Sequence, residues 1–494
     1  MTSTKLSAAA LADLSVPVPT YDRSAVTAGI VHIGVGGFHR AHQAMYVDRL
    51  LEAGLAQEWG ICGVGMLPAD ARMRDALVGQ DHLYTLVLKH PDGRREPRVI
   101  GSIVDYLLAA DDPAAAVARL ADPATRIVSL TVTEGGYNIN NTTGEFAGDH
   151  RDVQHDVAEL GAPRTTFGLV VAALARRRAA GTEPFTVMSC DNIQGNGDVA
   201  RRVFSAFADL VDADLGGWVR ERVAFPNCMV DRITPATTEA DRAEVEQLFG
   251  ISDAWPTVCE PFTQWVLEDH FGQGRPPYEQ VGVQIVDDVL PYEHMKLRLL
   301  NAGHQGLAYF GTLAGYTYVH DTMADDLFAP YLRAYWQREA IPTLGAVPGV
   351  DLDDYCNQLV ERFGNPEVAD TNARLAFDGS ERMTKFLLPV VTARLVAGED
   401  CRVSAAICAS WARYCEGADE HGRPITLDDQ RAEQLTEAAS RHDRDPLAFL
   451  RQPDLFGTLI DQRRFTDPYL AALQSLRSRG ARATLADLVR DDST

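Results

Sequence analysis

The segment from Ile30 to His42 places a short apolar run directly before a glycine-rich turn and the start of a helical pattern, IVHIGVGGFHRAH. Gly34 and Gly36 fill the first two positions of a GxGxxG pattern, but His39 stands where the third glycine is usual. Such a turn lets the backbone approach a pyrophosphate, whose charge is met by the amides that begin the helix. The turn predicts a dinucleotide site, with a plain strand-to-helix turn as the alternative. The residues expected to contact the dinucleotide are Gly34, Gly36, Gly37 and Phe38.

Short β-branched runs alternate with helical patterns from Ile30 to Val286, as in a parallel sheet covered by helices. The strands expected are Ile30–Gly34, Gly60–Met66, Ile127–Thr133, Phe185–Cys190 and Val223–Val230. The helices expected between them are Ala41–Ala53, Phe167–Ala180 and Val199–Leu210. Tyr84–His90 and Arg98–Tyr106 are predicted to form an inserted hairpin, because the HPDGRR segment between them is rich in turn residues.

Helical periods dominate the chain after Pro291. The helices expected there are His294–Leu313, Leu352–Phe363, Arg382–Leu395, Ser404–Glu416, Asp428–Ser440 and Tyr469–Arg479. A chain of 494 residues is too long for one ordinary core. We therefore predict an α/β N-terminal domain at residues 1–286 and a mainly α-helical C-terminal domain at residues 287–494, with the site in the cleft between them.

The charge balance limits the class of partner. The net charge is -23, with 69 acidic against 46 basic residues. Nucleic acids and anionic membranes require a positive surface, so a small-molecule partner is expected. No stretch of about 18 apolar residues and no signal-peptide pattern is present, which predicts a cytoplasmic protein.

The eight cysteines form no CxxC pair, and no histidines cluster near them in the sequence. Neither a disulfide scaffold nor a metal site is therefore expected. Cys401, Cys408 and Cys415 recur every seven residues. This spacing could suggest a row of ligands, but a buried stripe of one helix is the interpretation we favour.

The stretch YEHMKLRLLNAGH contains Lys296, Asn301 and His304, a base, an amide donor and an imidazole. Oxidation of an alcohol requires a proton acceptor, and lysine can serve only if burial or positive potential lowers its pKa. At about 100° per residue, Lys296, Leu300 and His304 share one helix face, with Asn301 at its margin. A lysine that extends to solvent, a capping asparagine and a core histidine would fit the spacing equally well.

Two further segments carry polar groups beside expected strands. Asn192 in SCDNIQGNG follows a strand and is a candidate second amide donor, so that two amides would polarise one oxygen without a metal. The alternative is ordinary turn chemistry. Asp70 in GVGMLPAD follows the second strand and is a candidate for the ribose contact, which favours NAD over NADP because a carboxylate repels a 2′-phosphate. Asp70 could also simply cap the following helix.

Tyr292 and Lys296 also match the YxxxK pair of short-chain dehydrogenases. We discount this match because that family places the pair much nearer the nucleotide strand and uses a differently spaced glycine turn. A zinc alcohol dehydrogenase is disfavoured because no cysteine and histidine ligand set is apparent.

Together these segments resemble the polyol-specific long-chain dehydrogenase/reductase family over essentially the whole chain. The resemblance rests on GVGGFHRAH, TVTEGGY at Thr131–Tyr137, SCDNIQGNG, VAFPNCMVDRITP at Val223–Pro235 and the K-x4-N-x2-H set. It implies a Rossmann-type N-terminal domain, a mostly helical C-terminal domain, an NAD cofactor and no metal. Asp253–Phe271 is most similar to members that interconvert D-mannitol and D-fructose.

The resemblance also implies roles for single residues. Lys296 would be the general base, Asn192 and Asn301 would polarise the reacting oxygen, and His304 would bind and orient the substrate. Asp231 and Arg374 match positions that line the polyol site, and Glu293 matches one that helps to move protons. Asp70 matches the ribose contact, but Ala69 stands where relatives are often acidic, so some use of NADP is conceivable.

The function expected is therefore metal-independent, NAD-dependent oxidation of D-mannitol at C2 and the reverse reduction of D-fructose. Sister enzymes that act on D-arabinitol or fructuronate are the nearest alternatives, and a nucleotide-binding sensor without catalysis is the alternative from another class. The partners expected are a polyol or ketose substrate and, for assembly, a monomer or small homo-oligomer.

Overall fold

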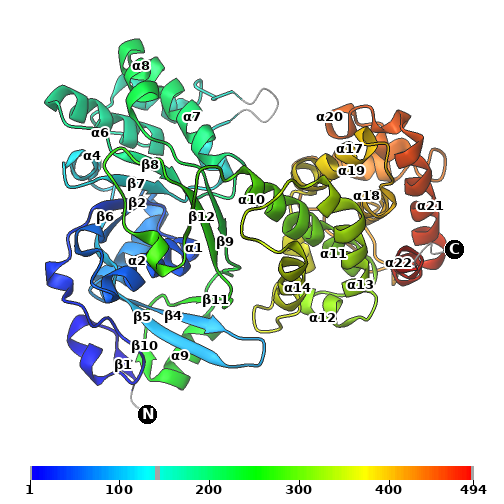
Figure 1. Cartoon of the computed structure of the whole chain (residues 1–494), viewed down its shortest axis with the longest axis horizontal. Coiled ribbons are helices and arrows are strands. Elements are labelled where there is room, and N and C mark those ends of the chain that lie inside the picture. Colours follow the sequence, from blue (N-terminus) through cyan, green and yellow to red (C-terminus); the bar gives the residue numbers. More distant parts are fainter. Residues whose placement is uncertain (1–2, 140–144, 491–494) are drawn as a thin grey trace. The chain divides into compact units, whose positions relative to one another are not determined.

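The computed structural model describes residues 3–139 and 145–490. The chain divides into two compact units, Met1–Val289 and Leu290–Thr494 (Figure 1). Within the described residues every strand lies in the first unit, and the second unit is built from helices. The predicted fold class, a parallel-sheet N-terminal part followed by a mainly helical C-terminal part, is thereby confirmed.

A five-stranded parallel sheet forms the centre of the first unit, in the order β6-β3-β2-β7-β8. Its strands are β2 (Ile30–Ile33), β3 (Ile61–Gly65), β6 (Ile103–Leu108), β7 (Ile127–Leu130) and β8 (Thr186–Ser189). In the central strand, Ile30 pairs with Ile61 on one side and with Ile127 on the other. Strand order reverses between β2 and β7, where sheets of this kind bind ligands at the carboxyl ends of the strands.

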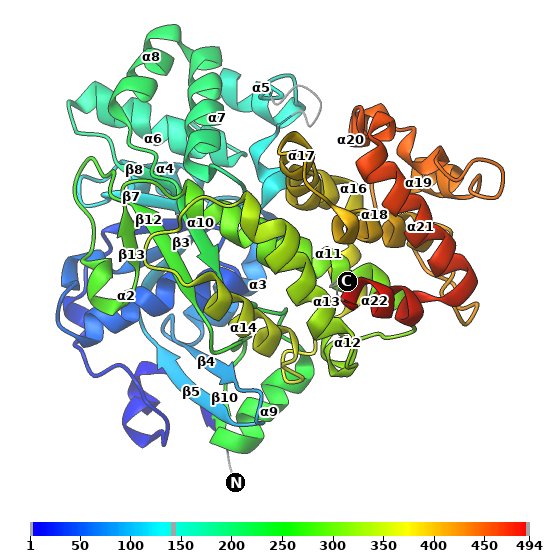
Figure 2. The ribbon, with the colours of Figure 1, turned by 45° about the vertical axis from the view of Figure 1, so that its right-hand side comes forward.

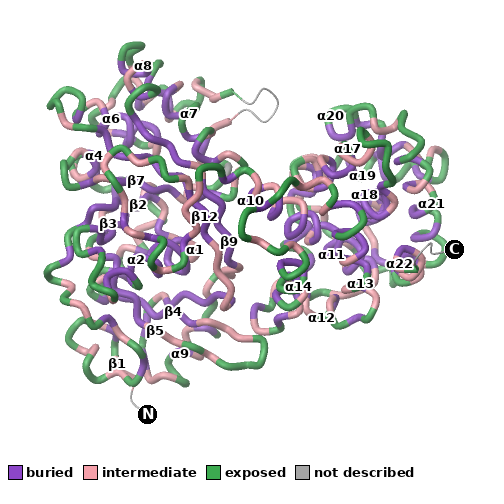
Figure 3. Tube along the Cα trace, viewed as in Figure 1, coloured by how far each residue is buried: buried purple, intermediate pink, exposed green. Residues whose placement is uncertain are grey.

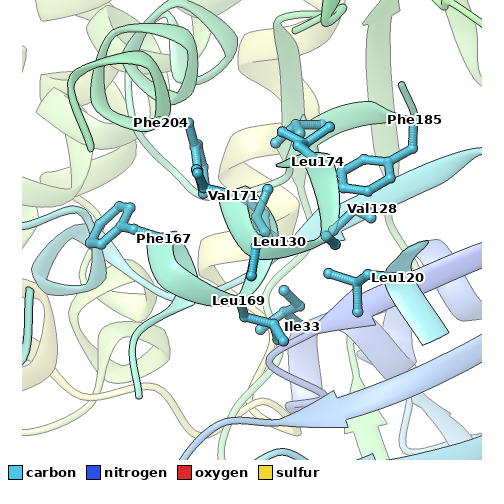
Figure 4. Packing of buried hydrophobic residues seen from close by; sticks show 14 of the residues in the cluster. Ile33, Leu120, Val128, Leu130, Phe167, Leu169, Val171, Leu174, Phe185 and Phe204 are labelled. Carbon is cyan, nitrogen blue, oxygen red and sulfur yellow. The ribbon is translucent and has the colours of Figure 1, made fainter. Parts of the chain in front are cut away.

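Helices cover both faces of this sheet, so β2, β3, β7 and β8 are buried along their whole length. Ile33, Val128 and Leu130 pack on one face against side chains of α4 (Pro113–Ala121), α6 (Thr166–Ala180) and α7 (Asn196–Val211) (Figure 4). Residues of the opposite face pack against α2 (Gln43–Glu52) and α3 (Ala71–Val78). The remaining helices of this unit are α1 (Gly37–Ala41), α5 (Arg151–Ala158), α8 (Ala213–Arg222) and α9 (Glu239–Phe249).

The predicted strand Arg98–Tyr106 is wrong, because the chain leaves one sheet and enters another within it. β4 (Tyr84–Lys89) and β5 (Arg95–Ile100) form the expected hairpin, to which β11 (Thr257–Cys259) adds a third strand. The backbone amide of Gly101 then donates to Asp48 of α2 at 3.0 Å, and Ser102 Oγ donates to the carbonyl of Ala44 at 2.7 Å. These bonds to a helix end β5 and let β6 join the parallel sheet.

The predicted strand Val223–Val230 is also misplaced. The observed strand is β9 (Cys228–Asp231), which pairs antiparallel with β12 (Gln264–Glu268) in a separate sheet completed by β13 (Gln284–Val286). Pro226 lacks an amide for a ladder bond, and Asn227 N donates to the Glu268 carboxylate at 2.9 Å, so the strand begins only afterwards. A two-stranded pair, β1 (Thr4–Lys5) with β10 (Ile251–Ser252), completes the unit.

The side chains of α18 (Arg402–Tyr414) are buried on nearly every face (Figures 2 and 3). This helix lies at the centre of the second unit. The helices of this unit are α10 (Leu290–Met295), α11 (Ala302–Leu313), α12 (Val319–Ala324), α13 (Phe328–Tyr335), α14 (Leu352–Phe363), α15 (Asn372–Ala376), α16 (Gly379–Arg382), α17 (Leu388–Val396), α18 (Arg402–Tyr414), α19 (Ala432–Ala439), α20 (Pro453–Phe456), α21 (Arg463–Arg479) and α22 (Ala481–Val489). Short π-helical segments interrupt three of these helical runs, at Lys296–Asn301, Trp336–Ala340 and Met383–Leu387.

The predicted helix Asp428–Ser440 begins four residues late, at Ala432. Asp429 instead accepts hydrogen bonds from the amide and the hydroxyl of Ser380, both at 2.7 Å, and Asp428 O accepts from Asp378 N at 2.8 Å. The first residues of the predicted helix therefore hold the start of α16.

All eight cysteines are buried and free, which confirms Cys401, Cys408 and Cys415 as core residues. In residues 3–139 and 145–490, no helix is long and apolar enough to cross a membrane.

Candidate active site

The glycine turn lies at the carboxyl end of β2, the central strand. Gly34 has φ +93°, and a Cβ there would lie 2.2 Å from the carbonyl oxygen of Thr131, which follows β7. Only glycine fits this position. A Cβ on Gly36 would meet nothing closer than 3.9 Å, so the surface above the turn is open. α1 begins at Gly37, and its first amides have no partner earlier in the helix. This open turn and these amides fit a dinucleotide pyrophosphate.

His39, where a third glycine is usual, turns inward below the turn. Its buried ring stacks on that of His32 with centroids 3.4 Å apart. Burial lowers the pKa of His32 to about 3 and holds the pKa of His39 well below its ordinary value. His32 Nε2 lies 2.9 Å from Thr131 Oγ1, and its Nδ1 lies 2.8 Å from Ser129 Oγ. Two neutral imidazoles therefore replace the close helix packing that the third glycine normally allows.

Asp70 follows β3, as the sequence predicted, and is half-buried. Its carboxylate accepts a hydrogen bond from the backbone amide of Leu67 at 2.9 Å. This bond closes the 3-10 turn Pro68–Asp70, and the Asp70 side chain makes no capping hydrogen bond to α3, so the alternative role as a helix cap is wrong. One carboxylate oxygen makes this bond, which leaves acceptor capacity for a second donor.

Asn192 lies in the loop between β8 and α7, at the carboxyl end of the sheet, and its side chain is exposed. The loop is held by its neighbour Asp191, which accepts from Thr133 N at 2.8 Å and from Tyr137 OH at 2.7 Å. Thr133 adopts φ +66°, a left-handed conformation that is strained for threonine. Asp191 was not among the predicted residues. Its two hydrogen bonds join the TVTEGGY segment to the SCDNIQGNG segment in space.

Asn196 anchors the other end of this loop. Its side-chain amide donates to the carbonyls of Asp191 and Cys228, at 3.0 and 2.8 Å. Asp231 ends β9 and is buried. The next residue, Arg232, donates to the carbonyl of Ala41 at 2.7 Å and so ties the end of β9 to α1.

In the second unit, Lys296 and Asn301 open and close the π-helical segment between α10 and α11. Both side chains are buried, with 7% of each exposed. A π-helix bonds residues five positions apart, so the wide turn runs from the backbone of Lys296 to that of Asn301. The prediction of one continuous α-helical face is therefore wrong, because residues 296–301 form a π-helical turn. The prediction assumed 100° per residue throughout, whereas the chain advances by a smaller angle per residue in the wider turn.

His304 follows on α11, and its ring lies 4.6 Å from that of Phe363. Burial and the positive charges of four neighbours hold the pKa of His304 well below its ordinary value, so the imidazole is neutral. The four cations, in order of effect, are Arg374, Arg362, Arg382 and Lys296. Arg362 and Arg382 were not predicted, because nothing in their local sequence distinguishes them from surface arginines.

Arg374 lies on α15, and its side chain is partly exposed. Its Nε donates to Asp370 at 2.5 Å, and this hydrogen bond raises the pKa of Arg374. Glu293 is buried on α10, three positions before Lys296 and thus on the same side of the helix. Tyr292, the rival tyrosine of the YxxxK pattern, donates its hydroxyl to the carbonyl of Pro348 at 2.8 Å.

Among the described residues, no group of three or more His, Cys, Asp or Glu side chains is arranged to hold a metal ion. A cavity of about 410 Å³ lies beside α7, α8 and the end of β12, lined in part by Arg201, Arg222 and Glu268. None of the predicted site residues lines it.

A glycine turn on the central strand, beside a reversal of strand order, defines the first unit as a dinucleotide-binding domain of the Rossmann type. Residues 28–280 match the family model described as the mannitol dehydrogenase Rossmann domain, and residues 288–477 match the mannitol dehydrogenase C-terminal domain. The chain therefore belongs to the mannitol dehydrogenase family.

Individual relatives are similar over nearly the whole chain. Mannitol 2-dehydrogenase of Phaeosphaeria nodorum is 48% identical over 476 residues, 96% of this chain and 83% of the relative. The structure of Pseudomonas fluorescens mannitol 2-dehydrogenase in a ternary complex with NAD and D-mannitol has a TM-score of 0.88 at 47% identity, covering 98% of this chain and 99% of that one. A substrate-free D-sorbitol dehydrogenase has a TM-score of 0.91 at 39% identity, covering 97% and 100%.

Proposed function

We propose that this protein catalyses the NAD-dependent oxidation of D-mannitol at C2 to D-fructose, and the reverse reduction, without a metal. The observation that carries the proposal is that Lys296 and Asn301 are both buried on one π-helical segment, five positions apart. The similarity to an enzyme whose structure holds NAD and D-mannitol supports this choice of substrate and cofactor. Residues 1–286 would bind NAD, and residues 287–494 would supply the base.

The proposed roles follow from the chemistry of each side chain. Lys296 removes the proton of the C2 hydroxyl, a step that requires its amine in the neutral form. Asn192 and Asn301 donate to the reacting oxygen as its negative charge develops. Bound NAD supplies the hydride acceptor. In the reverse direction the protonated Lys296 returns the proton to the oxygen.

Further residues would hold the polyol and move protons. Neutral His304 can both donate and accept hydrogen bonds, which suits a substrate hydroxyl. Asp231 and Arg374 would line the polyol site, and Glu293, on the Lys296 side of α10, would exchange protons with that lysine. Gly34, Gly36, Gly37, Phe38 and Asp70 would contact NAD. A cytoplasmic location and a monomeric or small homo-oligomeric state remain predictions from the sequence.

The substrate assignment is tested by initial rates in both directions. D-Mannitol and D-sorbitol are epimers at C2 and both yield D-fructose, so NAD reduction must be compared with each of them. D-Fructose, fructuronate and D-xylulose are compared in the direction of NADH oxidation, with and without a chelator. Fastest turnover of D-mannitol and D-fructose, unaffected by the chelator, is expected.

Other outcomes of this comparison would reassign the protein. Preference for D-sorbitol, fructuronate or D-xylulose would move it to a sister activity. NADH binding without turnover of any of these compounds would indicate a nucleotide-binding sensor.

The two asparagines are expected to have similar, large effects. Asn192→Ala and Asn301→Ala should each lower kcat for D-mannitol by about 10²–10³-fold, or 2.7–4 kcal/mol, the usual effect of removing one oxyanion donor. NADH affinity and thermal stability are measured alongside. A decrease in kcat of less than about fivefold would show that the residue has a structural role and does not donate to the reacting oxygen.

Cofactor preference is expected to depend on the charge of Asp70. Asp70→Asn keeps an oxygen that can accept from Leu67 N but removes the charge that would repel a 2′-phosphate. The ratio of kcat/KM for NADP to that for NAD should rise by about tenfold, equivalent to ~1.4 kcal/mol. Asp75→Asn, which changes an exposed carboxylate on the following helix α3, is the matched control and should leave the ratio unchanged.

A further inference from the structure

The π-helical segment Lys296–Asn301 is one of three in the described part of the second unit, and it packs against both of the others, Trp336–Ala340 and Met383–Leu387. π-Helical turns are rare and occur mostly as single insertions at functional sites. An α-helical turn is intrinsically favoured, so contacts from elsewhere in the fold must select the wider turn.

The wide turn changes which backbone groups of the segment bond to each other. In an α-helix, the carbonyl of Arg298 would accept from the amide of Ala302, four residues later. Here that amide bonds to the carbonyls of Leu297 and Leu299 instead. The Arg298 carbonyl has therefore lost the amide that would bond it in an α-helix. Buried carbonyls are generally hydrogen-bonded, so a side-chain donor at this carbonyl stabilises the wider turn.

The last residue of α13 and the first residue of the π-helical segment after it donate to the carbonyls of Arg298 and Leu299. Tyr335 OH donates to Arg298 O at 3.0 Å, and Trp336 Nε1 donates to Leu299 O at 2.9 Å. Both side chains are fully buried. The indole also lies directly against the start of α11, since a Cβ on Gly303 would be 3.4 Å from Trp336 Nε1.

The run that carries these donors is fixed at other points. Glu339 accepts from Val403 N at 2.5 Å and from Ser404 N at 2.7 Å, at the start of α18. Arg298 itself donates to the carbonyl of Thr343 at 2.6 Å. Residues 335–343 therefore form a fixed support for residues 298 and 299.

We propose that Tyr335 and Trp336 are positioning residues for Lys296: their hydrogen bonds to the carbonyls of Arg298 and Leu299 hold the π-helical turn that begins at Lys296 and ends at Asn301. The inference rests on the proposed function of Lys296 as the base. Without these bonds the segment can return to an α-helical turn, which rotates Asn301 relative to Lys296 about the helix axis.

The test uses variants of the full-length protein that remove single polar atoms. Tyr335→Phe removes only the hydroxyl, and Trp336→Phe removes the indole donor. Tyr331→Phe is the matched control, because Tyr331 is equally buried on the same helix and its hydroxyl has no hydrogen-bond partner among the described residues. For each variant we would measure kcat and KM for D-mannitol, the pH midpoint of kcat, NADH affinity, and amide hydrogen exchange of residues 296–302.

Tyr335→Phe and Trp336→Phe are expected to lower kcat by about ten- to hundredfold, as small displacements of reacting groups do. The pH midpoint should shift and exchange at residues 296–302 should accelerate, whereas NADH affinity and the Tyr331→Phe control should match the wild type. Wild-type kcat and pH midpoint in both variants would overturn the inference, even if stability falls. Normal turnover in a Lys296→Ala variant would instead overturn the proposed function.

Discussion

Replacing Lys296 with alanine is expected to lower kcat for D-mannitol oxidation by about 10⁴-fold, the upper end of the range for loss of a general base. The amine is buried, so bulk water has little access to the position from which the proton must be taken. The glycine turn lies in the other unit, and NADH should therefore bind with unchanged affinity. Steady-state rates with saturating D-mannitol and fluorescence titration with NADH measure the two quantities.

Small primary amines provide an independent check on this prediction. The space left by the lysine side chain should admit methylamine, and the rate of the variant should rise with amine concentration. Lys5→Ala, which removes an exposed lysine, serves as the control and should have wild-type kcat. Turnover of Lys296→Ala within tenfold of the wild type would exclude the lysine as the base.

Gly34→Ala is expected to disrupt the first unit itself. The added Cβ would lie 2.2 Å from the carbonyl oxygen of Thr131, and φ at this position is +93°. A non-glycine residue in this conformation costs about 1–2 kcal/mol, and a forced overlap in a packed region costs about 1–3 kcal/mol more. The free energy of unfolding of the first unit should fall by roughly 2–5 kcal/mol, and NADH binding should be lost. Denaturant unfolding followed by circular dichroism measures the first effect.

Gly36→Ala is the matched comparison, because it adds the same methyl group two residues later. Here φ is -102° and the nearest atom to the new Cβ is 3.9 Å away, so stability should not change. NADH affinity should nevertheless fall by about tenfold if the pyrophosphate approaches this backbone. Wild-type stability of Gly34→Ala would contradict the geometry of the turn, and normal NADH affinity of Gly36→Ala would remove Gly36 from the cofactor contacts.

The parallel sheet was predictable because its strands are buried on both faces. Local sequence shows this directly, because mostly apolar residues make up the strands Ile30–Ile33, Ile61–Gly65, Ile127–Leu130 and Thr186–Ser189. The segment Arg98–Tyr106 is equally apolar in character, yet it contributes to two sheets. The break at Gly101 depends on a hydrogen bond to Asp48 of α2, a long-range contact without a local signal.

The residues of the candidate site were largely predictable, but their arrangement was not. Periodicity correctly predicted a helical run through Lys296, Asn301 and His304. The π-helical turn within it depends on donors at Tyr335 and Trp336, more than thirty positions away in the chain. The cations around His304 come from separate helices. The approach of Arg362 on α14 and Arg382 on α16 to this histidine depends on tertiary packing, which has no local sequence signal.

The burial of the cysteines determines how fast this protein reacts with oxidants and alkylating reagents. All eight thiols are free and buried, and burial raises the pKa of several of them, that of Cys62 and Cys401 to about 12. Only the thiolate reacts readily, and its fraction at neutral pH is then negligible. The folded chain therefore resists thiol modification, and the rate at which its cysteines are labelled reports how often each part of the core opens.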